Sequence, residues 1–498
     1  MSSTTTTRAD GSGSTAPAGD GGGDADGGAG GVSPPEKSFA SGARILTIGI
    51  ASTGIFTFLY LATASHVLSA SSYSRISLCW AIMFVILSVI YRPIEQLLSR
   101  TIADRRARGL HGHTLRVPAA IQGGFAVLFL IVALVLRDQI QQGMFDGSST
   151  LYWILVIGVL AYAGSYFARG WLAGHQRFAL YGGLVFLEST SRFLFPLAVA
   201  VGIGSGQGAV GLGMAVAPFA SLSVMPLAFR RIRGHVSSGG SAAAGADTVV
   251  AADAAGAGEG PAQTQLEESG GDLTMRHGAR FAVSVVGIMF SEQMLMNAGV
   301  LIVAAKTGGG DLTTGIVGFV FNVMLIVRAP LQLFQAIQTS ILPHLAGLEA
   351  REGAAEFHKA IRTTVLVIAA FGLAVALGLL AIGPPVMSAV LGDKGGFTYG
   401  RLGLAAVGLG MGLHLISGTL NQAALARGRA AGAAVAWLIA AALFVAYVAT
   451  GAQHSEVARV EVGYLGATAV LTMLLWLLYR RGPARAASSS SRLASNPA

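Results

Sequence analysis

The sequence predicts an all-α integral membrane protein with twelve transmembrane helices, arranged as two parallel-related bundles of six. Hydrophobic residues make up 53% of the 498 positions and charged residues only 11%, whereas soluble domains carry about 25% charged residues. The chain contains twelve apolar runs, each close to the roughly 20 residues that a helix needs to cross a bilayer. A long polar segment separates six runs from six. An even number of crossings gives both halves the same orientation, as in a parallel repeat.

The apolar runs follow one another with short polar connections, except at the centre of the chain. The expected spans are 45–64, 76–98, 117–136, 151–172, 179–201, 208–229, 281–304, 314–340, 361–382, 402–423, 431–450 and 460–479. Around them we expect a disordered cytoplasmic segment at 1–40, the first bundle at 41–233, a disordered cytoplasmic linker at 234–275, the second bundle at 276–482 and a disordered tail at 483–498. These segments are rich in small and polar residues, so they cannot bury enough apolar surface to fold.

Lysine and arginine are distributed unevenly between the two sets of connections. If the N-terminus is cytoplasmic, 24 of the 33 basic residues fall on the cytoplasmic side, 6 on the opposite side and 3 within spans. Cytoplasmic connections of membrane proteins carry an excess of Lys and Arg. We therefore expect a multi-pass protein of the plasma membrane with both termini cytoplasmic. The net charge of +9 then reflects topology, and no nucleic-acid partner is expected.

Two of the spans carry polar residues at related places in the two halves. The stretch 322–343 contains Arg328 and the stretch 80–100 contains Arg92, and a proline follows each arginine within two residues. An arginine in a lipid-spanning helix costs about 2.5–3.5 kcal/mol on insertion scales, and a proline removes a backbone hydrogen bond. Both are tolerated where the helix faces protein or a water-filled cavity. We expect Arg328 to line such a cavity, whereas Arg92 either does so or extends to the membrane surface.

Further charged residues within the spans have roles that their spacing indicates. Glu188 and Arg192 lie four residues apart, in the order that favours an ion pair on a helix. They form a structural pair or, alternatively, a functional site. Glu292 has no basic residue four positions away. We expect it to pair with Arg328, because unpaired charge inside a membrane is costly; the alternatives are that it binds a proton or cation or contacts a ligand.

Each of the remaining polar residues of the spans has two possible roles. His414 is expected to be a buried, hydrogen-bonded residue rather than a proton relay. Gln332 and Gln335 either line a cavity or hydrogen-bond neighbouring helices. Glu95, three residues after Arg92, is a structural or functional candidate of the same kind as Glu188.

Motifs of the common enzyme and metal-site classes are absent from the sequence. There is no GxxxxGK[ST] phosphate loop, no HExxH, no CxxC and no GxSxG, the patterns that mark nucleotide, zinc, redox and serine-nucleophile sites. The single cysteine, Cys79, excludes an intramolecular disulfide and a cysteine metal cluster. We therefore expect no enzymatic activity, no ATP-driven step, and neither a cofactor nor a metal.

Three places along the chain carry a family resemblance. The chain reads RAPLQLFQ from Arg328 and LP at 342–343, RPIEQ from Arg92 with Arg100 and a basic loop at 105–108, and Arg169-Gly170 with Gly174 and Arg177 after the fourth span. These residues resemble span 8, the end of span 2 and the turn after span 4 of the polysaccharide and lipid-linked oligosaccharide flippases. Those flippases belong to the multidrug/oligosaccharidyl-lipid/polysaccharide exporter (MOP) superfamily. The resemblance covers about 41–482, without the linker.

The resemblance implies two bundles around a central cavity that opens to each side of the membrane in turn, driven by a cation gradient or the membrane potential. The implied substrate is a polyprenyl-pyrophosphate-linked oligosaccharide, moved from the cytoplasmic to the outer leaflet as a polysaccharide or cell-wall precursor. A pyrophosphate cannot cross hydrocarbon cheaply, and arginine binds phosphate bidentately, so Arg328 and Arg92 would hold it. Gln332, Gln335 and Asn322 would hydrogen-bond the sugar. Membrane lipids, and glycosyltransferases or a polymerase of the same pathway, are the implied partners.

Two other functions remain open at this point. The first is a cation-coupled multidrug exporter of the same superfamily. For a transporter of either kind, Glu188, Arg192, Glu95 and His414 are structural or coupling candidates. The second is a membrane scaffold that transports nothing and recruits glycan-synthesis enzymes through its cytoplasmic segments. Arginine at related positions of the two halves favours an anionic substrate and hence the flippase.

Overall fold

The computed structural model describes residues 34–107, 115–226, 275–307, 315–328, 330–331, 334, 354–393, 396–450 and 455–480. Over these residues the regular structure is helical, and no strand occurs among them. The chain divides into two compact units, 1–40 and 41–498. All elements described below belong to the second unit, apart from the first residues of helix α1 (Pro34–Val67).

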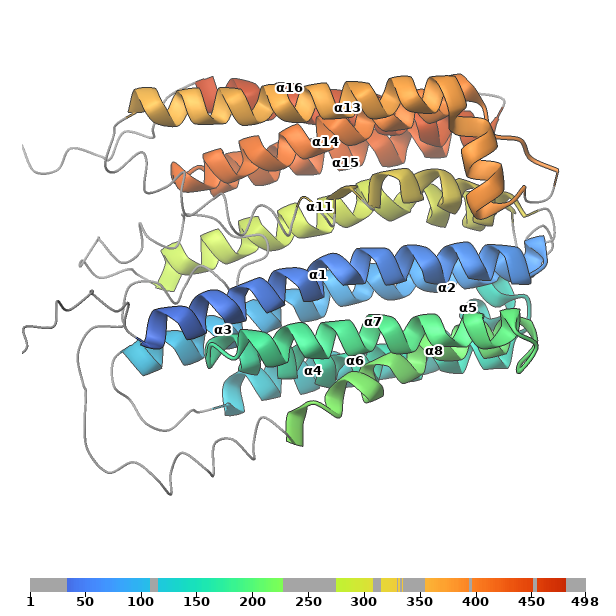
Figure 1. Cartoon of the computed structure of the whole chain (residues 1–498), viewed down its shortest axis with the longest axis horizontal. Coiled ribbons are helices and arrows are strands. Elements are labelled where there is room, and N and C mark those ends of the chain that lie inside the picture. Colours follow the sequence, from blue (N-terminus) through green and yellow to red (C-terminus); the bar gives the residue numbers. More distant parts are fainter. Residues whose placement is uncertain are drawn as a thin grey trace, which may run out of the picture. The chain divides into compact units, whose positions relative to one another are not determined.

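The first half of the second unit is a bundle built around helix α6. Its elements are α1, α2 (Ala70–Ile86), η1 (Leu87–Tyr91), α3 (Arg92–Ala107), α4 (Arg116–Val135), α5 (Arg137–Phe145), α6 (Ser149–Gly174), α7 (Phe178–Ala200) and α8 (Gly206–Leu222). Helix α6 packs against α3 and α8, and α7 packs against α8, so these helices lie side by side (Figure 1).

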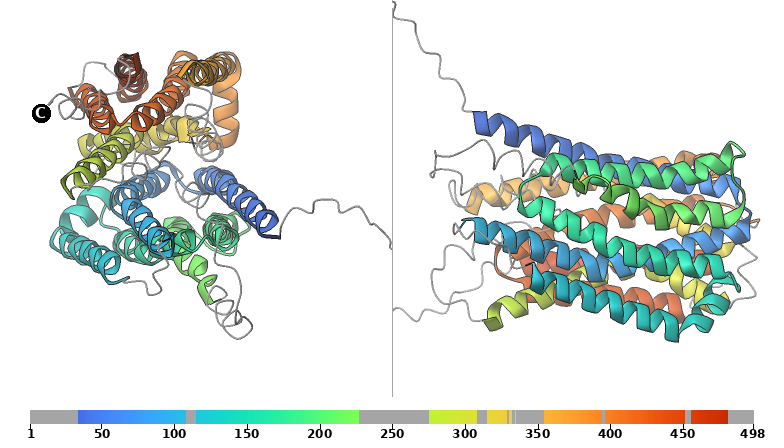
Figure 2. Two further views of the ribbon diagram at one scale, coloured as in Figure 1. Left: turned by 90° about the vertical axis from the view of Figure 1, so that its left-hand side faces the viewer. Right: turned by 90° about the horizontal axis from the view of Figure 1, so that it is seen from below.

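The second half is a bundle in which α14 has the central place. Its elements are α11 (Met275–Thr307), a short helix Ile316–Arg328, α13 (Ala354–Leu391), α14 (Arg401–Ala426), α15 (Ala430–Thr450) and α16 (Glu456–Arg480). Helix α14 packs against α13 and α16, and α11 packs against α15. Seen along the helices, α13 to α16 form one group, and α11 also packs against α2 of the first half (Figure 2).

The predicted fold class is confirmed. Among the described residues, nine helices are long and apolar enough to cross a membrane, and two shorter apolar helices are Gly206–Leu222 and Ile316–Arg328. Together with α1, each of them overlaps one of the twelve predicted spans. The short helix α5 between the third and fourth spans was not predicted. Helices α4 and α13 bury only 17% of their most apolar window, which is expected of helices that face lipid.

A π-helix interrupts the second span immediately before Arg92 and Pro93. The backbone N–H of Arg92 donates to the carbonyl of Leu87, five residues earlier, at the end of η1. Proline has no N–H to donate and its ring collides with the carbonyl four residues before it in a regular helix. A single π turn widens the helix and accommodates that collision. The span therefore continues through Pro93 into α3, which carries Glu95.

Candidate functional site

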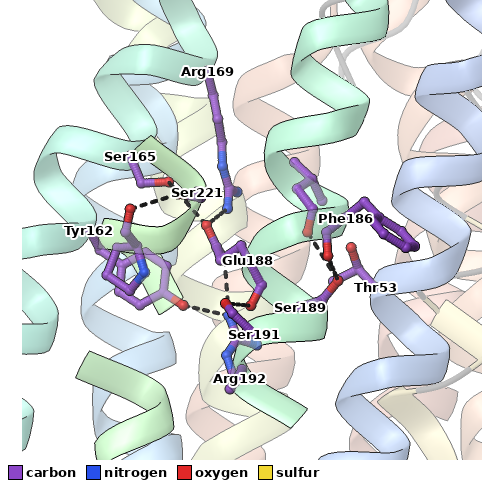
Figure 3. Close-up of polar contacts among 12 residues, drawn as sticks. Thr53, Tyr162, Ser165, Arg169, Phe186, Glu188, Ser189, Ser191, Arg192 and Ser221 are labelled. Carbon is purple, nitrogen blue, oxygen red and sulfur yellow. Dashed lines mark hydrogen bonds and ion pairs between the residues drawn. The ribbon is translucent and has the colours of Figure 1, made fainter. Parts of the chain in front are cut away.

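A network of buried charges joins α6 and α7 in the first half. The carboxylate of Glu188, on α7, is 4% exposed. Its Oε1 accepts a hydrogen bond from Arg192 Nη2 (3.0 Å), and its Oε2 accepts from Arg169 Nη2 (2.5 Å) and from Ser165 Oγ (3.0 Å). Figure 3 shows Arg169 and Arg192 approaching the carboxylate from opposite sides. The predicted ion pair between Glu188 and Arg192 is present, and a third charge completes it.

The network residues that helix α6 contributes lie on one of its faces. Tyr162, Ser165 and Arg169 are three and four residues apart, the spacing that puts side chains on one side of a helix. Arg192 donates to the hydroxyl of Tyr162 and lies 5.1 Å from the centre of the Trp80 ring. A guanidinium above an aromatic face is stabilised by the ring quadrupole. The ion pairs and hydrogen bonds of Glu188 are therefore made by side chains that α6 and α7 present to each other.

Glu95 adds a second carboxylate to this network from helix α3. It is 8% exposed and accepts a hydrogen bond from the hydroxyl of Tyr181 (2.6 Å). The charges of Arg169 and Arg92 both act on it. Helix α3 can lie this close because α6 has glycine at the crossing. A Cβ atom at Gly170 would lie 2.7 Å from the carbonyl oxygen of Glu95, closer than real contacts allow.

Arg169 is the functional candidate that the sequence does not identify. Its place in the resemblance puts it in the turn after the fourth span, and counting basic residues puts it on the cytoplasmic side. In the structure it lies within α6, and its side chain is 12% exposed. The predicted span 151–172 already contains position 169. The signal in the sequence is the spacing: Arg169 lies on the same helical face as Tyr162 and Ser165.

In the second half, Arg328 has a different partner from the expected one. Its Nη2 donates to Asn297 Oδ1 (2.5 Å) and to the carbonyl of Met296 (3.4 Å), both on α11. Asn297 is held by a hydrogen bond from its Nδ2 to Gln293 Oε1 (3.1 Å), which leaves its oxygen free for the arginine. The expected ion pair between Arg328 and Glu292 is not formed.

The reason lies in the position of Glu292 along α11. It precedes Asn297 by five residues, which corresponds to about 7.5 Å along a helix and to a different face. Arg328 lies at the level of Asn297, so it cannot also reach Glu292. The charge of Glu292 instead interacts with that of Arg92. The charge of Arg92 thus acts on a carboxylate of each half, Glu292 and Glu95.

Asn322 lies at a contact between the two halves. It is completely buried, and its Oδ1 accepts a hydrogen bond from the hydroxyl of Tyr73 on α2 (2.5 Å). Next to it, the N–H of Gly318 donates to Ser74 Oγ (3.1 Å). The amide of Asn322 is therefore engaged with another helix, and its expected role in binding sugar would require this contact to break.

Tyr399, in the connection between α13 and α14, completes the contact. Its hydroxyl accepts from Asn322 Nδ2 (3.2 Å) and donates to the carbonyl of Gly392 (3.2 Å). Its ring stacks on that of Phe319, with centroids 4.5 Å apart. Burial raises the pKa of Tyr399 to about 12, because the phenolate would lose its hydration. The hydroxyl therefore stays protonated and remains a donor at neutral pH.

Of the other predicted residues, His414 is buried and hydrogen-bonded, as expected. It is 1% exposed, and its Nδ1 lies 2.9 Å from the hydroxyl of Tyr464 on α16. Gln332 and Gln335 lie outside the described residues. Among the described residues no group of three or more His, Cys, Asp or Glu side chains could hold a metal ion.

The comparisons with known proteins identify the fold. No protein-family model matches the chain, and no curated protein sequence matches it. A mutant of the Vibrio cholerae MATE transporter VcmN is 15% identical, with 89% of this chain and 98% of that chain covered and a TM-score of 0.56. An outward-facing multidrug resistance MATE family transporter of the MOP superfamily is 14% identical, with 90% and 95% covered and a TM-score of 0.57. A eukaryotic MATE transporter is 13% identical, with 90% and 96% covered and a TM-score of 0.54.

These likenesses show that the chain has the fold of MATE transporters, with twelve helices in two bundles. The MATE transporters belong to the MOP superfamily, so the fold agrees with the superfamily that the sequence resembles. Identities of 13–15% do not distinguish its branches.

Proposed function

We propose that this protein is a membrane transporter in which two six-helix bundles expose a shared site to each side of the membrane in turn, with both termini in the cytoplasm. Its fold supports this function, since the similar solved structures are transporters. In this transport cycle, the contact between the halves forms and breaks. It consists of Tyr73, Asn322 and Tyr399.

For the substrate, we propose an amphipathic molecule with an anionic group, such as a polyprenyl-pyrophosphate-linked oligosaccharide. The observation that carries this proposal is the environment of Arg328. Its hydrogen bonds go to a neutral amide and a carbonyl, and none of the described carboxylates pairs with it. Its Nε is buried without a hydrogen-bond partner. A guanidinium inside a membrane that lacks a counter-charge is suited to receive a phosphate.

A cation-coupled multidrug exporter is the second candidate, and the comparisons favour it. The similar solved structures include a multidrug resistance transporter. The described spans also contain acidic residues that could attract cations, Glu292 among them. Part of this acidity is offset, because two arginines neutralise Glu188.

Reconstitution into liposomes separates the two candidates. We expect the purified protein to move a fluorescent polyprenyl-pyrophosphate-linked sugar between leaflets, measured by protection from a membrane-impermeant quencher. We expect no accumulation of a cationic dye under a proton or sodium gradient. Dye transport without movement of the lipid would establish the multidrug function. Movement of neither would reject the proposal that the protein is a transporter of these classes.

The scaffold function makes a prediction of its own. Deletion of 1–36 and 238–273 should leave transport within about twofold of the full chain, because neither segment belongs to the predicted bundles. A scaffold would lose its function when these segments are removed. Growth or glycan synthesis in a strain that depends on the protein would show which outcome holds, with membrane abundance measured in parallel.

Tyr73→Phe tests whether the contact between the halves opens. The variant loses one hydrogen bond worth about 1 kcal/mol, so the population with the halves apart at this end should rise about fivefold. Spin labels on cysteines at His66 and Leu402, which are exposed at the ends of α1 and α14, report the distance distribution. The native Cys79 is buried and should not interfere.

Tyr152→Phe is the matched control for this measurement. Its hydroxyl donates to the carbonyl of Ala133 (2.9 Å) within the first half, so its loss should cost similar stability and leave the distances between the labels unchanged. Equal distance distributions in Tyr73→Phe and in the parent protein would show that the contact does not limit opening.

A further inference from the structure

Helices α14 and α16 share a line of polar groups that the proposed substrate site does not use. Tyr464 on α16 meets His414 Nδ1 (2.9 Å), and deeper in the pair Ser417 Oγ meets Thr472 Oγ1 (2.9 Å). The helices are close here because α14 has glycine at the contact. A Cβ at Gly410 would lie 2.8 Å from the Tyr464 ring. Polar side chains along one contact between helices provide hydrogen-bonding groups across much of the membrane.

Glu461 lies on the same contact, near the start of α16. It is 8% exposed. Among the described residues it has neither a hydrogen bond nor an ion pair, and no charged side chain acts on it. Its carboxyl group rests on the first turn of α14, where a Cβ at Gly403 would lie 2.0 Å from its Oε2. Only a residue without a side chain leaves room for it.

The two buried carboxylates of the network in the first half differ from Glu461, because both have hydrogen-bonding partners. Glu188 is held by two guanidiniums and a hydroxyl, and Glu95 accepts from a tyrosine hydroxyl. An ionised carboxylate is stable between two guanidiniums, as at Glu188. Burial without a partner favours the neutral acid, because the charged form loses its hydration and gains nothing in return.

Among the described residues, the charged groups near the beginning of α14 and α16 do not pair with Glu461. Arg459 pairs with Glu456, Lys306 of α11 donates to the carbonyl of Val448, and Arg401 of α14 is exposed. The remaining titratable groups on these helices near the polar line are Tyr447 of α15, Tyr464 of α16, His414 of α14 and Glu292 of α11. Glu292 interacts with Arg92 and Tyr464. None of these groups supplies Glu461 with a counter-charge.

We propose that Glu461 is a proton-binding site, filled from the membrane face at which α14 and α16 begin. It lies five residues from the start of α16, so that face is within about two helical turns. Intramembrane carboxyl groups without a structural partner mark routes of protons and ions. Coupling of this proton to transport rests on the proposed function, whereas the protonation of Glu461 does not.

The test is chemical modification of the full chain in micelles with dicyclohexylcarbodiimide. This reagent adds to a protonated carboxyl group in apolar surroundings. Peptide mass spectrometry should find Glu461 modified at neutral pH, with modification falling at least tenfold at alkaline pH, and not protected by sodium ions. Glu188 and Glu456 are internal controls that should stay unmodified, since both are ion-paired. The pH dependence is normalised to a small carboxylic acid in the same micelles.

An unmodified Glu461, or modification that does not depend on pH, would overturn the proposal. Protection by sodium ions would overturn it too, because it would assign a metal cation to the site. Glu461→Gln mimics the protonated acid and should transport at a rate that no longer changes with the proton gradient, whereas Glu456→Gln should behave as the parent. If Glu461 is modified as expected but the protein transports neither test substrate, the proton site is supported and the proposed function is rejected.

Discussion

Replacement of Glu188 by alanine is expected to lower the free energy of unfolding by about 3–5 kcal/mol, the cost of removing one partner from a buried ion pair. The carboxylate is shared by Arg169 and Arg192, which are 12% and 2% exposed in their side chains. Without it, the two guanidiniums remain inside the bundle and lose the carboxylate that they share. The loss should be measured by equilibrium unfolding in detergent, together with the monodisperse fraction on size exclusion.

Asp146→Asn is the matched control, since it also removes the acidic partner of an arginine. Asp146 Oδ2 lies 3.0 Å from Arg75 Nη2, but its side chain is 45% exposed. Water replaces the lost partner there, so the cost should stay below about 1 kcal/mol. An effect of Glu188→Ala no larger than that of Asp146→Asn would show that the network does not hold the first half together.

The structure also decides what exchanging Glu188 and Arg192 should do. If the two residues formed an isolated pair, the exchange would preserve it and the protein would fold. Because Arg169 also binds position 188, the exchanged protein would place two arginines against each other. We expect the exchange to destabilise the protein about as much as Glu188→Ala, and a stable, active exchange variant would contradict the three-residue network.

The sequence predicts features that depend on spacing along one helix. Twelve apolar runs predicted twelve helices, and the four-residue spacing of Glu188 and Arg192 predicted their ion pair, because both follow from helix geometry alone. The same reasoning fails for contacts between helices. Tyr73 and Asn322 lie 249 residues apart, and no pattern in the sequence joins them.

The wrong pairing of Glu292 with Arg328 has the same origin. The two charges complement each other, but their levels in the bundle depend on how α11 and helix 316–328 are placed. That placement is determined by packing and not by either segment. The sequence does not identify Glu461 as a candidate, because a charged residue at the beginning of a span is expected at the membrane surface. Its burial against Gly403 depends on a second helix.

Arg328→Ala is expected to reduce movement of the lipid-linked substrate at least tenfold, while Arg328→Lys retains part of it. A hydrogen bond to a charged group contributes about 1.5–3 kcal/mol, which corresponds to roughly tenfold or more in rate or affinity. Lysine keeps the charge but lacks the planar fork that binds a phosphate at two oxygens. The rates should be compared at equal amounts of reconstituted protein.

Asn297→Ala separates the role of the arginine from that of its neighbour. Arg328 lies 4.8 Å from the centre of the Phe321 ring, and Asn297 accepts the shorter of its two hydrogen bonds. Removing that acceptor should leave the guanidinium in place with more of its donors unused. An anionic substrate should then bind at least as tightly as in the parent protein.

Normal transport by a well-folded Arg328→Ala protein would contradict the proposal that Arg328 binds the substrate. Unchanged export of a cationic dye by the Arg328→Ala variant would support the multidrug function, because in that function Arg328 does not bind the substrate.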